Sequence, residues 1–177
     1  MFDEKFAIPG VGGIMVKEES GKKYILIQER FKEDAVLENG MLEIPAGEIR
    51  EFENIFDCLR REITEETGYT VSCIEGENEA EKVVRNGYTV LNYKPFSCSQ
   101  NIDGKYPVMV QVFICHLSTE KGGITESSES KNIRWIEINE LKKLLKNENR
   151  FYPMHISTLR KYLKRKQKSS NITIAST

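Results

Sequence analysis

The sequence lacks several features that would point to particular classes of protein. It contains no run of about 18 apolar residues, so a helical membrane span is not expected. Its 26 basic and 27 acidic residues leave a net charge of −1, which gives no global attraction to nucleic acid or to an anionic membrane. The N-terminal MFDEKFAIPG includes acidic residues and no long apolar core, unlike a secretory signal peptide. We therefore expect a cytoplasmic protein that binds neither nucleic acid nor membrane.

Cysteine is scarce and gives no metal or disulfide pattern. The chain has four cysteines, widely spaced and without a C-x-x-C pair: Cys58, Cys73, Cys98 and Cys115. A zinc site or a disulfide framework is disfavoured by that spacing, and reduced, partly buried thiols are expected. Any particular ligand preference must therefore come from a local group of residues.

Strand and helix patterns alternate along the 177 residues, which suit a single domain over 1–177. Two β-prone runs, 11–17 and 23–30, flank the turn-like EESG and predict a hairpin. Helices are expected around 141–145 and, as a C-terminal extension, from about residue 150. The acidic stretch 76–87 is expected to be a loop or a short helix. Further strands are expected at 41–45, 69–74, 88–96, 108–117 and 131–138.

The most regular pattern predicts a helix over residues 54–67. Ile55, Leu59 and Ile63 recur every four residues and form an apolar stripe. Asn54 is a favourable N-cap, and Gly68 is a typical terminator. This helix is expected to bury one face and leave the other for a different purpose.

Three carboxylates fall on that second face. Residues three and four apart are neighbours on a helix, so Glu62 lies near Glu65 and Glu66, and their like charges repel. A solvated acidic face is one interpretation. The other is a site for a hard divalent cation, Mg²⁺ or Mn²⁺. Arg61 stands beside the patch, and Glu53, two turns earlier, is placed to pair with it.

The spacing of these residues resembles the signature of the Nudix hydrolases, G-x5-E-x7-R-E-U-x-E-E-x-G-U, where U is a bulky apolar residue. Tyr69 departs from the usual aliphatic residue at the last position. LIQER upstream, LEIPAGE before the motif and RWIEINEL downstream are also similar to that family. The fixed positions of the signature are occupied by Gly47, Glu53, Arg61, Glu62, Ile63, Glu65, Glu66 and Gly68.

The resemblance implies an α/β fold of the Nudix type, a mixed β-sheet sandwiched between α-helices. It also implies an enzyme that uses Mg²⁺ or Mn²⁺ to hydrolyse a nucleoside diphosphate linked to another moiety. The matching positions assign metal binding to Glu62, Glu65 and Glu66, with the carbonyl of Ala46 as a further ligand. Glu62 and Glu65 are also assigned to catalysis. Glu53 and Arg61 would orient the catalytic loop and helix.

The general base varies across the family, and the sequence does not decide it. A motif glutamate is one candidate. Glu126 and Glu129, in the polar segment before Trp135, are others, although both also suit an ordinary surface.

The leaving group is less well defined by the sequence. IPAGE is similar to hydrolases of ADP-ribose and other nucleotide sugars, which favours such a substrate. Those enzymes usually have a longer N-terminal region, and Arg85 stands where they often have proline. A nucleoside triphosphate, including an oxidised dNTP, therefore stays open, as does a nucleotide-sensing module without catalysis. Arg30, Tyr88 and Phe96 are candidates for binding the small nucleotide, and a homodimer is compatible with the sequence.

Overall fold

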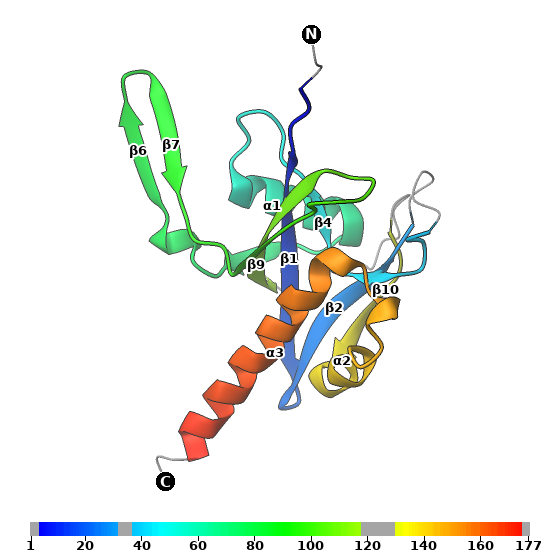
Figure 1. Cartoon of the computed structure of the whole chain (residues 1–177). Coiled ribbons are helices and arrows are strands. Elements are labelled where there is room, and N and C mark those ends of the chain that lie inside the picture. Colours follow the sequence, from blue (N-terminus) through cyan, green and yellow to red (C-terminus); the bar gives the residue numbers. More distant parts are fainter. Residues whose placement is uncertain (1–3, 32–36, 118–129, 175–177) are drawn as a thin grey trace.

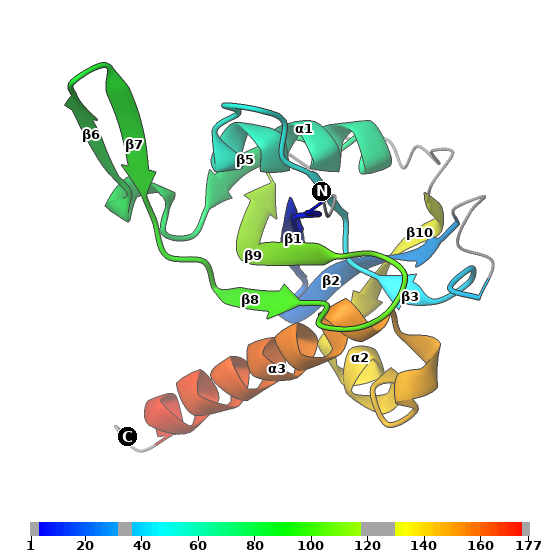
Figure 2. The ribbon, with the colours of Figure 1, turned by 45° about the horizontal axis from the view of Figure 1, so that its top comes forward.

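A mixed β-sheet with helices on both faces forms the centre of the molecule (Figure 1, Figure 2). The computed structural model describes residues 4–31, 37–117 and 130–174. Its elements are β1 (Ile8–Glu19), β2 (Lys22–Arg30), β3 (Leu42–Glu43), β4 (Ala46–Glu48), α1 (Ile55–Thr67), β5 (Val71–Ile74), η1 (Glu77–Glu79), β6 (Glu81–Arg85), β7 (Tyr88–Asn92), β8 (Ser97–Gln100), β9 (Val108–Leu117), β10 (Ser130–Glu137), α2 (Ile138–Leu144), η2 (Glu148–Arg150) and α3 (Pro153–Ile174). The predicted sheet between helices is confirmed.

Strand β1 organises the sheet. It forms an antiparallel hairpin with β2 and a parallel pair with β9, within the strand order β10-β2-β1-β9-β5. Strands β3, β4 and β8 join this sheet by pairing with β2, β1 and β9. The first half of β1 pairs with β4, so that Val11 lies opposite Gly47. The centre of the sheet therefore holds the segment that leads into α1.

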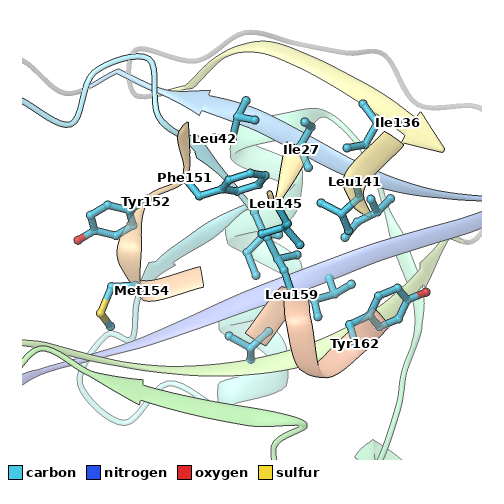
Figure 3. Packing of buried hydrophobic residues seen from close by; sticks show 14 of the residues in the cluster. Ile27, Leu42, Ile136, Leu141, Leu145, Phe151, Tyr152, Met154, Leu159 and Tyr162 are labelled. Atoms are coloured by element: carbon cyan, nitrogen blue, oxygen red, sulfur yellow. The ribbon is translucent and has the colours of Figure 1, made fainter. Parts of the chain in front are cut away.

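Two apolar cores lie on the two faces of the sheet. Helix α1 covers one face, and Figure 2 shows α2 and α3 on the other. The core under α2 and α3 contains Leu141, Phe151, Leu159 and Tyr162, which meet sheet residues such as Ile27 (Figure 3). The helix predicted as a C-terminal extension thus closes one core with its first turns. Among the described residues, no helix is long and apolar enough to span a membrane.

The largest departure from the sequence-based expectations is the stretch 76–87. It contains the short helix η1, as expected, but continues into strand β6, which was not predicted. The missed signal is Asn86-Gly87, whose φ angles of 53° and 81° make a two-residue type I′ turn between β6 and β7. The acidic residues before this turn are typical of a loop and mask the strand pattern of β6 in the sequence.

Gly13 lies where α1 packs on the sheet. A Cβ at this position would stand 2.7 Å from Ile63 Cδ1 and 3.3 Å from Leu59 Cδ1. We expect Gly13→Ala to lower the free energy of unfolding by about 1–3 kcal/mol, because a packed core cannot accept an extra methyl group. Ile63→Val removes the clashing methyl group, so the double variant should lose less than the sum of the two single changes. Urea unfolding of the three variants measures this, and strict additivity would contradict the assigned contact.

His155 is a buried, neutral histidine near the start of α3. Its Nδ1 accepts a hydrogen bond from Ile44 N at 3.3 Å, and burial lowers its pKa to about 3. Below about pH 6.5 the unfolded chain binds a proton that the folded protein does not, so stability should fall as the pH drops from about 6.5 to about 3. The full loss is on the order of 3–5 kcal/mol.

Thermal unfolding at pH 7, 5 and 4 checks this expectation for His155. His155→Asn keeps an acceptor for the Ile44 N–H but does not titrate, so its unfolding temperature should depend less on pH over this window. Equal pH dependence in the two proteins would show that another group controls acid unfolding.

Candidate functional site

Helix α1 carries the acidic face and is fixed at both ends. The Asn54 side chain accepts a hydrogen bond from Phe56 N at 2.9 Å, which satisfies a free donor of the first turn. At the other end, Gly68 has a φ of 72° and donates its N–H to Thr64 O at 2.9 Å. Ile55, Leu59 and Ile63 are buried against the sheet, as predicted. The carboxylates therefore lie on a helix that is capped at both ends.

Glu53 and Arg61 form the ion pair predicted between the loop and the helix. Arg61 Nε and Nη2 donate to the two carboxylate oxygens of Glu53 at 2.8 and 2.9 Å. These hydrogen bonds hold the pKa of Glu53 at about 2. Glu53 also accepts from Arg50 N at 3.0 Å, and Arg61 reaches Glu48 O at 3.3 Å. The pair thereby ties the incoming loop to the middle of α1.

The same arginine contacts two further glutamates. Arg61 Nη1 donates to Glu62 and, at 3.2 Å, to Glu65. Burial raises the pKa of Glu62, and Arg61 partly offsets this. Among the motif glutamates Glu65 has the most exposed side chain, 54% accessible, against 15% for Glu62. A single guanidinium thus holds three of the four motif glutamates.

Gly47 is required by the position of Glu62. A Cβ on Gly47 would lie 1.9 Å from Glu62 Cδ and 2.1 Å from its Oε2. Gly47 belongs to β4 and is paired with Val11, and it is not among the described glycines with a positive φ. The glycine therefore makes room for a carboxylate within a strand and does not form a turn.

Glu66 is set apart from the other motif glutamates. It is buried and accepts hydrogen bonds from Gln28 Nε2 at 3.0 Å and from Ala46 N at 3.2 Å. Burial, together with the nearby charge of Glu43, raises its pKa to about 8. No cationic side chain among the described residues contacts Glu66. Its negative charge therefore has only neutral hydrogen-bond donors as partners.

A polar row extends from Glu66 across β2 and β3. Gln28 Nε2 also lies 3.5 Å from Glu43 Oε1, and Arg30 Nη1 donates to Glu43 Oε2 at 3.2 Å. Arg30 further donates to Glu38 at 3.0 Å and stacks on the Tyr152 ring at 4.4 Å. Sequence reasoning missed Gln28 and Glu43. The available signal was a polar residue directly beside apolar ones, since Gln28 follows the apolar run 25–27 and Glu43 stands between Leu42 and Ile44.

This donor set fits a hard divalent cation. Three carboxylates, those of Glu62, Glu65 and Glu66, and the backbone at Ala46 offer oxygen ligands of the kind that Mg²⁺ and Mn²⁺ prefer. The raised pKa of buried Glu66 shows a charge that its neighbours leave uncompensated. In the described residues, however, no three such side chains already converge on one point. Arg61 draws Glu62 and Glu65 toward itself, so these two must turn to share an ion with Glu66.

Two predicted nucleotide-binding residues do not lie among these carboxylates. Tyr88 is on β7 and is 72% exposed, on a hairpin that projects from the body (Figure 1). Phe96 packs beside α3, with its ring 6.5 Å from that of Tyr162 and Lys161 Nζ above it at 4.8 Å. The sequence patterns around Tyr88 and Phe96 do not reveal that the segments carrying these two residues run away from α1. Glu126 and Glu129 fall outside the described residues.

Comparison with known proteins is consistent with this site. The family model of the NUDIX domain matches residues 7–155. No curated protein sequence matches the chain.

Solved structures show the same fold. The NUDIX domain of Shewanella oneidensis NrtR, complexed with ADP ribose, is 14% identical with a TM-score of 0.64, covering 92% of this chain and 90% of its own. The MutT protein of Methanosarcina mazei Go1 is 19% identical with a TM-score of 0.62, covering 93% and 98%. The Ap4A hydrolase of C. elegans is 17% identical with a TM-score of 0.56, covering 88% and 95%.

Proposed function

We propose that this chain, which belongs to the Nudix family and is a Nudix hydrolase, cleaves the diphosphate linkage of a nucleotide sugar such as ADP-ribose and uses Mg²⁺ or Mn²⁺ to do so. The observation that carries this proposal is the buried carboxylate of Glu66. It is held by Gln28 and Ala46 and has a raised pKa, next to two further glutamates on the same helix. Such a site is suited to a divalent cation and to a substrate that carries phosphate.

The cation would be held by Glu62, Glu65 and Glu66, with the Ala46 carbonyl as a further ligand. When bound, it would neutralise the charge that develops on the phosphoryl oxygens during attack by water. Glu53 and Arg61 act as positioning residues, because their bidentate pair fixes the loop against α1. Phosphoryl transfer depends mainly on positioning and charge stabilisation, so a Ser or Cys nucleophile is not needed.

In the reaction, a water oxygen forms a bond to one phosphorus atom and the bond to the bridging oxygen breaks. For ADP-ribose the products are two phosphate monoesters, AMP and ribose 5-phosphate. Glu65 is the motif carboxylate most open to solvent. We therefore assign it the role of general base, which accepts the proton released by the attacking water. Glu66 keeps a fixed position through Gln28 and Ala46 throughout.

Two observations favour a nucleotide sugar. The nucleotide-sugar-like segment IPAGE lies at the site itself, because Ala46 N donates to Glu66 and Gly47 lies against the side chain of Glu62. The structurally similar NrtR domain was solved with ADP ribose. Arg30 has a side chain only 12% exposed and is already paired with Glu43. The predicted contact between Arg30 and a phosphate therefore requires that the substrate reach the edge of the Arg30–Glu43 ion pair.

A substrate panel tests the function. The purified chain would be assayed for product release with ADP-ribose, ADP-glucose, dinucleoside polyphosphates, and canonical and oxidised dNTPs, each with Mg²⁺, with Mn²⁺ and with EDTA. We expect the highest kcat/KM for a nucleotide sugar, and no turnover in EDTA. A dNTP as best substrate would favour the triphosphate alternative, and binding without turnover would favour a sensing module.

A further inference from the structure

The β6–β7 hairpin projects away from the rest of the molecule (Figure 1, Figure 2). Within the described part of the chain, its strands pair only with each other. All residues of β6 are exposed, and in β7 only Leu91 is partly covered. An isolated two-stranded hairpin is marginally stable in water. A partner that adds strands to this hairpin would therefore stabilise it.

One face of the hairpin has an apolar centre and polar ends. Val83 lies directly opposite Val90, and the two are 41% and 49% exposed. Arg85 opposite Tyr88 flanks this pair on one side, and Glu81 opposite Asn92 flanks it on the other. Among the described residues, neither Glu81 nor Arg85 has an ion-pair partner. The charges at the two ends of β6 thus have opposite signs and are both available.

The turn determines which backbone groups of β6 face outward. In a two-residue hairpin turn the carbonyl of the first residue accepts from the N–H of the fourth, here Arg85 and Tyr88. Hydrogen bonding then alternates along the strand, so Val83 also bonds inward to β7, while Lys82 and Val84 point to the outer edge. In both views β6 is the strand on the side away from the body. Its outer edge is therefore open to another strand.

The sequence of β6, EKVVR, is complementary to itself in antiparallel orientation. With Val83 opposite its own copy, Glu81 faces Arg85 of the second chain, and Lys82 faces Val84. We propose that β6 pairs in this register with β6 of a second copy of this chain, which produces a homodimer joined by a four-stranded sheet. The outward-facing Lys82 and Val84 become the hydrogen-bonded pairs, and Val83 becomes the non-hydrogen-bonded pair on the two-fold axis.

This register satisfies both the backbone and the side chains. The two Lys82–Val84 pairs provide four backbone hydrogen bonds between the chains. On one face, Val90 and Val83 of each copy form a continuous band of four valines. An ion pair between Glu81 and Arg85 closes the band at each end. Because only the hairpins meet, the dimer is weak, concentration-dependent and sensitive to salt.

Charge reversal tests the register directly. Sedimentation equilibrium of the full chain, from about 1 to about 500 µM, gives the dimer dissociation constant. Glu81→Lys or Arg85→Glu places like charges opposite each other at both ends, so each should weaken the dimer about tenfold or more. The double variant restores opposite charges and should return the constant to within about threefold of the parent. A monomeric parent, or a double variant as weak as the single variants, would overturn the proposal.

Proline substitutions identify the edge. Val84→Pro removes an outward N–H of β6 without removing a bond to β7, and it should abolish dimerisation. Thr89, opposite Val84, faces the outer edge of β7 by the same alternation, so Thr89→Pro is the matched control and should leave the dimer intact. Circular dichroism verifies that both variants fold. Loss of the dimer in Thr89→Pro but not in Val84→Pro would assign the interface to β7 and refute pairing through β6.

Discussion

Glu66→Gln is expected to lower kcat/KM by about 10²–10³-fold while leaving the protein folded. Its carboxylate is fixed by Gln28 Nε2 and Ala46 N, both of which are donors. A glutamine at this position removes the charge and brings an NH₂ group toward those donors. The loss corresponds to about 3–4 kcal/mol of transition-state stabilisation. Steady-state kinetics with the best substrate of the panel, at several Mg²⁺ concentrations, measures this loss.

Stability separates this effect from simple unfolding of the variant. The pKa of Glu66 is raised to about 8, so between about pH 4.5 and 8 the folded protein binds a proton that the unfolded chain does not. Ionising Glu66 therefore destabilises the fold as the pH rises through this range. At pH 8 without metal, Glu66→Gln should unfold at the same temperature as the parent or at a higher one. Adding Mg²⁺ should raise the unfolding temperature of the variant by less than it raises that of the parent.

Glu51→Gln is the matched control for Glu66→Gln. Glu51 is an exposed glutamate of the loop before α1, and the same chemical change there should alter neither kinetics nor the response to Mg²⁺. An unchanged rate and metal dependence in Glu66→Gln would refute the assigned role of this carboxylate. A similar loss in both variants would point to a general effect of net charge.

The sequence predicted α1 and its ion pair closely because both depend on local spacing. The stripe of Ile55, Leu59 and Ile63 and the two caps follow from a helical period, and eight residues bring Glu53 close to Arg61. Gln28 and Glu43 were missed because their role depends on strand pairing. The register places them opposite each other, and contact with Glu66 requires α1 to lie over those strands.

The same limit explains Tyr88 and Phe96. Both occur in aromatic strand patterns typical of a binding surface. Such a pattern does not show which face of a strand is turned toward the carboxylates, or whether the strand runs toward them at all. Phe96 is directed to α3, and Tyr88 projects with the hairpin. Gly47 shows a related limit. The motif identifies the glycine, but only the position of Glu62 against it shows why a side chain is excluded.

Gly47→Ala is therefore expected to reduce activity strongly and stability little. The added Cβ would lie within 2.5 Å of Glu62 Cγ and closer still to its Cδ, so the carboxylate must move. A long side chain can rotate away at small cost, and we expect the free energy of unfolding to change by less than about 1 kcal/mol. A displacement of about 1 Å in a catalytic group can reduce the rate about 10²-fold, which is the expected loss in kcat/KM.

Gly13→Ala provides the opposite case in the same structure. It adds the same methyl group, but against the buried Ile63 rather than against a movable carboxylate. Gly13→Ala should therefore lose stability and keep its kcat below the unfolding temperature, whereas Gly47→Ala should keep stability and lose kcat. Urea unfolding and kinetics on the two variants separate these effects. If Gly47→Ala retained full activity, the position of Glu62 against β4 could not be the one used in catalysis, and the carboxylate would have to act from another rotamer.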